Sequence, residues 1–287
     1  MEAREPVLEC NNVPSRPLMR YHGGKWRLAK WIISHFPGHR VYVESYAGAA
    51  SVLLRKPRAW CEVLNDLNGE VVNLFRVLRD RDAAAELIRQ VQLTPYAREE
   101  FEASYTADDD PVEQARRTLF RAACLRSPTG LFGVWTSGFR ADTTRRGSSV
   151  AQDWATLADV LPAIVDRLRG VIIEHRPALD VLVQYDAPDT LHYVDPPYLT
   201  ETRGERWAGK AYSHEMTEQD HRDLAGVLRG LRGHVVLSGY SHPLYAELYP
   251  DWQRYTHAAH ADSPTPRVEV LWVKPGGSLQ RPLLEVL

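Results

Sequence analysis

The sequence predicts an α/β protein built on a doubly wound, mostly parallel sheet with an antiparallel last strand and a mainly helical insertion. The first observation is a strand candidate at 41–44, followed by the turn "SYAGAAS" and an apolar run at 52–54 that we interpret as helical. The second is a strand candidate at 61–64, followed by "NDLNGE" and a helix through 71–78. Strand, glycine turn, helix and strand in this order are typical of the start of such a sheet.

The second half of the chain repeats this alternation. Strand candidates stand at 171–173, 191–194, 234–237 and 268–273. A helix is expected near 177–184, and Thr217 with Asp220 forms a capping box that starts another, ending near Leu231. The middle of the chain is strand-poor, helical at first and then irregular, which is typical of an inserted unit. We therefore predict an N-terminal arm at 1–17, one sheet domain from 18–80 and 166–287, and an inserted domain at 81–165.

Composition excludes several classes of protein. The chain has 287 residues, of which 44% are hydrophobic and 25% charged, and no apolar run reaches the 18 residues that a spanning helix needs. The first residues lack the basic start and apolar middle of a signal peptide. Three widely spaced cysteines fit a reducing compartment, and no cluster has the spacing of metal ligands. We expect a cytoplasmic protein without a metal or a membrane, and a monomer or weak dimer with no obligatory protein partner.

The charge distribution is informative although the formal net charge is only −2. Seven arginines stand between Arg116 and Arg146 against a single acid, Asp142. A solvated helix face accounts for the three at 116, 117 and 121. It accounts less well for Arg140, Arg145 and Arg146, which stand among Gly, Thr and Ser residues. This basic segment favours a nucleic acid as partner.

The stretch "YHGGK" near the N-terminus combines two glycines with a lysine. Gly23 and Gly24 permit close backbone approach, and Lys25 stands at the predicted start of a helix with Leu28 and Trp31 on one face. A lysine in this position suits an anionic group such as a ligand carboxylate. The alternative is an ordinary turn before a helix.

The stretch "VYVESYAGAAS" resembles a nucleotide-binding turn with a single glycine, Gly48, where the strand gives way to small residues. It does not match G-x-G-x-x-G, so it disfavours a nicotinamide-dependent dehydrogenase. Asp66 follows 18 residues later, at the end of the next strand. Doubly wound folds place a ribose-binding carboxylate there. The alternative is that Asp66 caps a helix starting near Asn68, and both can hold together.

The stretch "YVDPPY" ends a strand with a carboxylate, two prolines and an aromatic ring. Asp195 and the carbonyl of Pro196 are two acceptors with no donor between them, an arrangement that suits an amino group with two hydrogens. Tyr198 offers a face on which a base can stack, worth about 1–3 kcal/mol. The alternative is a plain strand terminus with an Asp-Pro turn.

Together these stretches resemble the N6-adenine DNA methyltransferases that include the Dam methylases. The resemblance is carried by "YHGGK", "YVESYAGAAS", "LNDLNGEVVNLFRVLR" and "YVDPPY", and extends through "HRDLAGVLRGLRGHVVLSGYSHPLYAELY" to "VEVLWVKP". The insertion "GFRADTTRRGSSVAQDW" is most similar to phage and prophage members, which implies a bacterial or phage-infected cell. The implied fold is the methyltransferase form of the doubly wound sheet, with residues 80–165 recognising the DNA target.

The resemblance also implies roles for particular residues. Site-specific transfer of a methyl group from S-adenosylmethionine to N6 of a flipped-out adenine is expected at Asp195, Pro196, Pro197 and Tyr198. The residues expected to bind the cofactor are Tyr21, Gly24, Lys25, Glu44, Tyr46, Gly48, Asp66 and Asp195. The residues expected to bind DNA are Arg126, Arg140, Arg145, Arg146, Arg203 and Arg206.

Arg203 and Arg206 lie in the glycine-punctuated segment after the "DPPY" motif, "LTETRGERWAGKAYSHE". This segment is expected to be a mobile loop that closes over the flipped base and a phosphate. Replacing both arginines by alanine should therefore lower DNA affinity and turnover.

Two departures from the family pattern concern the cofactor turn. Serine stands at position 45 where the family usually has proline, and Ala50 stands where it usually has glycine. Ala50 is tolerable there only if its φ angle is negative, so cofactor affinity is the property at stake.

Other functions remain as alternatives. The amino group could belong to cytosine N4, an RNA adenine or a protein glutamine, although Asp before Pro-Pro favours adenine by resemblance. A different class is a catalytically silent DNA-binding relative, which the intact "DPPY" motif disfavours.

Overall fold

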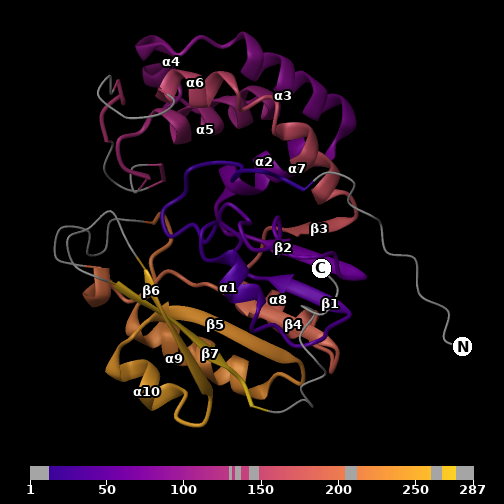
Figure 1. Ribbon diagram of the computed structural model, residues 1–287, viewed down its shortest axis with the longest axis vertical. Helices are drawn as coiled ribbons and strands as arrows, with labels where there is room; N and C mark the ends of the chain where they lie inside the picture. The colour runs from indigo at the N-terminus through magenta and orange to yellow at the C-terminus, as the bar shows by residue number, and fades with distance from the viewer. Residues whose placement is uncertain are drawn as a thin grey trace, which may run out of the picture.

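The computed structural model describes residues 13–128, 131–132, 137–141, 149–203, 212–259 and 267–275. Within this part of the chain the strands form one seven-stranded sheet, and helices lie on both of its faces (Figure 1). The strand order is β3-β2-β1-β4-β5-β7-β6. The first five of these strands are parallel, β7 runs antiparallel to β5, and β6 antiparallel to β7. The predicted fold class is confirmed.

The described elements have the following bounds. The strands are β1 (Val41–Glu44), β2 (Cys61–Asn65), β3 (Val171–Glu174), β4 (Thr190–Val194), β5 (His234–Tyr240), β6 (Gln253–Ala259) and β7 (Arg267–Val273). The helices are α1 (Ala29–Ile33), α2 (Gly69–Arg79), α3 (Arg81–Leu93), α4 (Arg98–Ala103), α5 (Pro111–Cys124), α6 (Val150–Ala155), α7 (Leu161–Leu168), α8 (Ala178–Gln184), the 3₁₀ turn η2 (Thr200–Arg203), α9 (Glu218–Gly230) and α10 (Pro243–Leu248).

The strand order contains one topological switch point. The chain moves outward from β1 through β2 to β3, and then returns to β4 on the other side of β1. In open α/β sheets the crevice at the carboxyl ends of the two strands at such a point is where ligands bind. Here these ends are Glu44 of β1 and Val194 of β4.

Alternate residues of each strand enter different cores, as strand geometry requires. On one face Leu191, Tyr193 and Leu271 join a large cluster with the N-terminal segment and helices α1 to α7. On the other face Val194 and Trp272 join a smaller cluster with α8, α9 and α10. The helices of the predicted insertion therefore share the core of the sheet. The predicted division at 81–165 stays a prediction.

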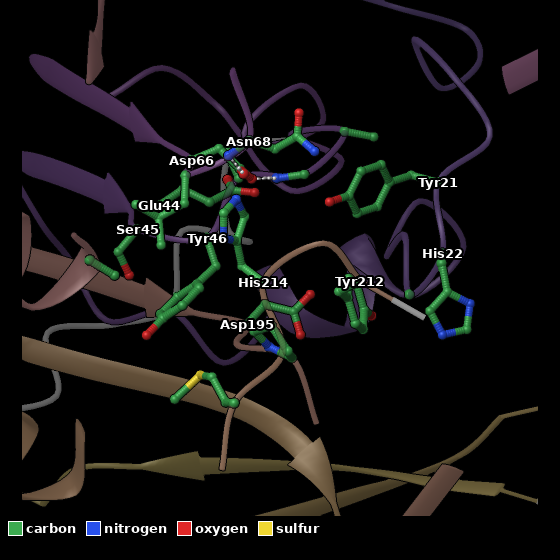
Figure 2. A pocket seen from close by; sticks show the side chains of 18 of the residues that line it. Tyr21, His22, Glu44, Ser45, Tyr46, Asp66, Asn68, Asp195, Tyr212 and His214 are labelled. Carbon is green, nitrogen blue, oxygen red and sulfur yellow. Dashed lines mark hydrogen bonds between the residues drawn. The ribbon is translucent and has the colours of Figure 1, made fainter. Parts of the chain in front are cut away.

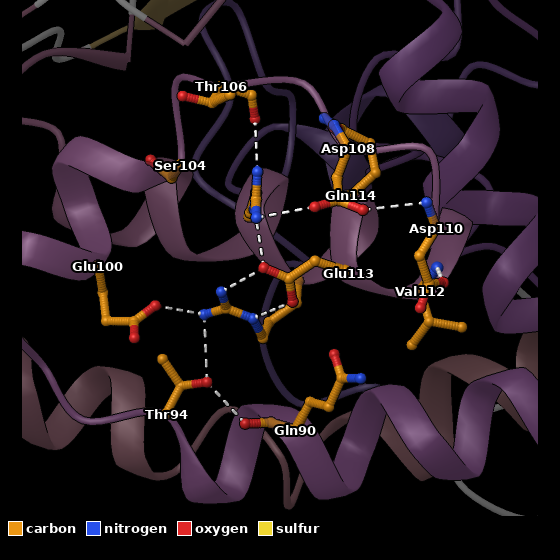
Figure 3. Close-up of polar contacts among 12 residues, drawn as sticks. Gln90, Thr94, Glu100, Ser104, Thr106, Asp108, Asp110, Val112, Glu113 and Gln114 are labelled. Carbon is orange, nitrogen blue, oxygen red and sulfur yellow. Dashed lines mark hydrogen bonds and ion pairs between the residues drawn. The ribbon is translucent and has the colours of Figure 1, made fainter.

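The arginines of α5 hold the helical layer together (Figure 3). Arg116 pairs with Glu113 of its own helix and Glu100 of α4, and Arg121 pairs with Glu70 of α2. Both arginine side chains are buried. The prediction that they form a solvated helix face is wrong, because each guanidinium is a crosslink between helices.

Three local predictions differ from the structure. Residues 51–55 form turns and no α-helix. The amide of Leu53 donates to the side chain of Glu44, at Oε2 (3.1 Å), instead of to a backbone carbonyl of the preceding helical turn. Helix α1 is short and begins only at Ala29, so Lys25 is not at its N-terminus. Strand β6 was not predicted, because this edge strand is largely exposed and lacks apolar alternation.

The other helix predictions hold well. Helix α8 occupies the predicted range, and Thr217 and Asp220 form the predicted capping box of α9. No described helix is long and apolar enough to cross a membrane. No group of three or more metal-ligating side chains is found among the described residues.

His192 of β4 makes the stability of the fold depend on pH. Its ring is fully buried and its Nε2 lies 3.4 Å from Asp186 Oδ1, and burial lowers its pKa to about 4 although that carboxylate acts to raise it. Because the unfolded chain has a histidine pKa near 6.5, it binds this proton first as the pH falls. The free energy of unfolding therefore has its full value above about pH 6.5. It falls progressively towards pH 4, by on the order of 3 kcal/mol for this side chain.

Urea denaturation at several pH values between 7 and 4 measures this loss. The variant His192→Gln should show a shallower fall across the same range. An identical fall in both proteins would contradict the assignment to His192.

Candidate active site

A pocket of about 580 Å³ opens at the switch point of the sheet (Figure 2). It is lined by the carboxyl ends of β1, β2 and β4, by the N-terminal segment 21–25, and by residues 212–216 before α9. All eight residues predicted to bind the cofactor line it: Tyr21, Gly24, Lys25, Glu44, Tyr46, Gly48, Asp66 and Asp195. Of the predicted catalytic residues, Asp195 and Pro197 also line the pocket. This placement brings the predicted residues together, and their individual roles stay predictions.

The turn after β1 requires glycine at position 48. Gly48 has φ +49°, and a Cβ added there would lie 2.7 Å from the ring of Tyr21. Its amide donates to Asp66 Oδ2 at 2.8 Å, which ties the end of β1 to the end of β2. The backbone thus comes close to the pocket without a side chain between.

Asp66 fixes two turns. Its second oxygen, Oδ1, accepts from the amide of Asn68 (2.8 Å), and burial raises the pKa of the carboxyl while both backbone donors act to lower it. The alternative that Asp66 caps the following helix is wrong. Asn68 is the N-cap of α2, because its side chain accepts from the amides of Glu70 and Val71.

Asp195 is held by donors on both of its oxygens. Lys25 Nζ lies 2.9 Å from Oδ2, and Ser238 Oγ donates to Oδ1 at 2.8 Å. Ser238 in turn lies 3.1 Å from the hydroxyl of Tyr193. The carboxylate is therefore oriented by a cation and a hydroxyl, and each oxygen keeps a lone pair for a further hydrogen.

Lys25 is buried between two carboxylates. Besides Asp195, its Nζ lies 3.5 Å from Glu269 Oε1, and it donates to the carbonyl of Gly23 at 2.7 Å. Burial acts to lower the pKa of Lys25, but the two carboxylates, Asp195 first, raise it above its ordinary value. Lys25 thus keeps its charge, and the structure directs that charge to protein carboxylates.

Glu44 enters the pocket from the end of β1. Its Oε2 accepts from the hydroxyl of Tyr42 (2.8 Å) and from the amide of Leu53 (3.1 Å). Burial nevertheless raises its pKa to about 8. At neutral pH, Glu44 is therefore mostly a neutral acid.

Tyr198 is 7% exposed. Its hydroxyl donates to Glu269 of β7, and its ring meets that of Tyr240 edge-on, with centroids 4.7 Å apart. Sequence reasoning missed Ser238 and Glu269. For Glu269 a signal existed, since it is an acid at an inward position of the alternating strand "RVEVLWV".

Two of the predicted DNA-binding arginines, Arg126 and Arg140, are among the described residues. Arg126 is exposed, its amide donates to the carbonyl of Gly138, and Arg140 N donates to the carbonyl of Cys124. Pro128, two residues after Arg126, lines the pocket. Arg145, Arg146 and Arg206 lie outside the described residues, and of Arg203 only the backbone, in η2, is described.

Ala50 adopts a left-handed backbone conformation. Its φ is +50°, so the condition that an alanine is tolerable there only at negative φ is wrong, and its methyl group is fully buried. The turn thus has two left-handed positions, Gly48 and Ala50, and tolerates a Cβ at the second. A left-handed conformation strains a non-glycine residue by about 1–2 kcal/mol.

Because of this strain, Ala50→Gly should destabilise the protein less than a buried alanine-to-glycine change usually does. Replacing a buried alanine by glycine normally removes a methyl group from the core and adds conformational freedom to the unfolded chain. Both effects destabilise the folded protein. At position 50 the relief of strain offsets these two effects. Ala50→Gly should therefore destabilise the protein by about 1–2 kcal/mol less than Ala29→Gly does, where Ala29 is a fully buried residue of helix α1. Urea denaturation compares the two, and equal losses would contradict the strained turn.

Comparison with known proteins identifies the family. A family model described as D12 class N6 adenine-specific DNA methyltransferase matches residues 21–261. No curated protein matches the chain. The match covers the switch-point pocket, the "DPPY" motif and well over half of the 287 residues. The expected resemblance is confirmed, and the chain belongs to the D12 class of N6 adenine-specific DNA methyltransferases.

Proposed function

We propose that this chain binds S-adenosylmethionine in the switch-point pocket and directs its methyl group to N6 of an adenine rotated out of DNA beside Asp195. Membership of the family implies S-adenosylmethionine as the methyl donor and DNA as the substrate. The observation that carries the proposal is the position of Asp195, which lines the pocket and is oriented by Lys25 and Ser238.

The charge of the pocket suits this cofactor. Among the described residues one lysine and no arginine line it, against the five carboxylates of Asp66, Asp195, Glu215, Asp220 and Asp223, with Glu44 mostly neutral. An acidic lining favours a ligand that carries a sulfonium and an ammonium group. Ser45 Oγ also lines the pocket, is buried and has no hydrogen-bond partner among the described residues, so a bound polar ligand or water would satisfy it.

Individual residues would hold different parts of the cofactor. The Gly48 turn would let the backbone approach it, and Asp66 would accept hydrogen bonds from ribose hydroxyls. Leu67, Pro177 and Leu179 give an apolar wall for a flat ring. When bound, the cofactor supplies a methyl group already activated on a sulfonium.

Asp195 acts on the nucleophile. The adenine amino group is weakly nucleophilic because its lone pair is delocalised into the ring. Asp195 and the Pro196 carbonyl would accept its two hydrogens, and this localises the lone pair towards the methyl group. Asp195 is also the acceptor for the proton that the nitrogen loses. A hydrogen bond to a charged acceptor contributes about 1.5–3 kcal/mol, and the positioning of the reactants supplies most of the rest.

DNA would approach the mouth of the pocket, next to Arg126 and Arg140. Phosphate contacts from arginines make binding fall steeply with salt concentration. The amino group takes part in base pairing, so the adenine must leave the helix before transfer. We infer that the protein acts in the cytoplasm of a bacterial or phage-infected cell, as a monomer or weak dimer.

A mismatch experiment tests base rotation. The methylated sequence is first mapped by modification-sensitive sequencing of DNA treated with the protein and S-adenosylmethionine. Duplexes with that adenine opposite thymine or opposite a mismatched base are then compared. We expect tighter binding to the mismatched duplex, because less pairing energy is lost. Equal affinities, or methylation only at another amino group, would overturn the proposal.

A further inference from the structure

Glu269 is an acidic residue buried on strand β7. It is 3% exposed and lies on the same face of β7 as the core residue Leu271. The antiparallel pairing of β5 with β7 places it opposite Tyr240. A buried carboxylate is unfavourable unless it is paired and hydrogen-bonded, so its partners indicate what it does.

The partners of Glu269 belong to the reaction centre. It accepts from the hydroxyl of Tyr198, and its Oε1 lies 3.5 Å from Lys25 Nζ. Lys25 is also within 2.9 Å of Asp195, and its Nζ lies 4.8 Å from the centre of the Tyr198 ring. Glu269 therefore connects the aromatic ring of the "DPPY" motif to the cation that holds the catalytic carboxylate.

The contacts of Tyr198 with Glu269, Lys25 and Tyr240 hold its ring. Glu269 holds the hydroxyl, Lys25 lies over the ring, and Tyr240 meets it at 77°. Of these contacts, the bond to Glu269 is the one that fixes the direction of the C–O axis. Tyr198 itself does not line the pocket, but a ring held in this way fixes the turn that carries Asp195 and Pro197, which do, and such preorganisation is a source of rate.

We propose that Glu269 is a positioning residue for methyl transfer, which holds the phenol of Tyr198 and thereby fixes the "DPPY" turn that presents Asp195 to the target adenine. This inference rests on the proposed function for its effect on rate. The contact between Glu269 and Tyr198 is independent of the proposed function. The two parts can therefore be tested separately.

The kinetic test is a double-mutant cycle in single-turnover methyl transfer, at saturating DNA and cofactor. Glu269→Ala should lower the rate roughly 10- to 100-fold, the effect of one hydrogen bond to a charged group. In the Tyr198→Phe background the same change should lower it by less than about threefold, because the hydroxyl is already absent. Glu269→Gln should recover most of the loss, since its amide oxygen can accept from the same hydroxyl.

Glu62→Gln is the matched control. Glu62 is an equally buried carboxylate, paired with Lys56 and Arg167 near the other end of the sheet. It should lower stability without lowering the single-turnover rate of the folded protein. Equal losses for Glu269→Ala in both backgrounds, or an unchanged rate, would overturn the proposal.

A readout that needs no activity separates this inference from the proposed function. In protein labelled with ¹³C at tyrosine rings, Tyr198→Phe identifies the Tyr198 signal. Glu269→Ala should shift that signal, and Glu62→Gln should not. If the signal shifts while the wild-type protein transfers no methyl group to DNA, the contact stands and the proposed function fails. If Glu269→Ala leaves the signal in place, the positioning role is wrong whatever the activity.

Discussion

Asp195→Ala is expected to abolish methyl transfer while the protein stays folded and retains its cofactor pocket. The loss should be at least roughly 10²–10⁴-fold, as for removal of a proton acceptor or a key electrostatic group. Folding should survive, because Lys25 keeps Glu269 and the carbonyl of Gly23 as partners. No buried lysine is then left without a counter-charge, which is the usual cause of a large loss of stability.

Thermal unfolding measures whether Asp195→Ala stays folded, and single-turnover kinetics measure its loss of methyl transfer. Asp251→Ala is the matched control, because Asp251 is an exposed aspartate paired with Arg229 on the surface. It should change neither the rate nor, by more than a few tenths of a kcal/mol, the stability. Substantial activity in Asp195→Ala would exclude Asp195 as the acceptor for the amino group.

Gly48→Ala is expected to weaken cofactor binding by about tenfold or more, equivalent to at least about 1.4 kcal/mol. Two effects add here. The left-handed backbone at φ +49° strains any residue with a Cβ by about 1–2 kcal/mol, and the new atom would lie 2.7 Å from the Tyr21 ring. The ring or the turn must move, and both line the pocket.

Calorimetric titration with S-adenosylmethionine measures the affinity, and the control is Gly226→Ala. Gly226 lies inside α9, and nothing lies within 4 Å of an added Cβ there. This control should stabilise the protein by about 0.5–1 kcal/mol and leave cofactor affinity unchanged. Wild-type affinity in Gly48→Ala would show that the turn does not contact the cofactor.

The parts of the site that the sequence predicted are those that follow a strand directly. Glu44, Asp66 and Asp195 each stand at or just after the carboxyl end of a parallel strand. Such ends meet at one edge of a sheet, so the residues had to lie together once the strands were recognised. The residues of the N-terminal "YHGGK" segment indicated only a possible anion site. That this segment lines the crevice came from family resemblance, since no local pattern indicates it.

The parts that were missed depend on tertiary pairing. Ser238 and Glu269 reach the site only because β5 pairs with β4 on one side and with β7 on the other. Whether an arginine on α5 faces solvent or a carboxylate of α2 likewise depends on how the helices pack. The positive φ of Ala50 could not be predicted, because an alanine by itself favours negative φ and the surrounding turn overrides that preference.

The central claim is that this chain methylates adenine N6 in DNA by means of the carboxylate at the end of β4. The most direct measurement gives the purified protein DNA and S-adenosylmethionine tritiated on its methyl group, and then separates the nucleosides of the digested DNA. The account predicts label in N6-methyldeoxyadenosine with the wild-type protein and none above background with Asp195→Ala. Label in another nucleoside, or equal label with both proteins, would contradict it.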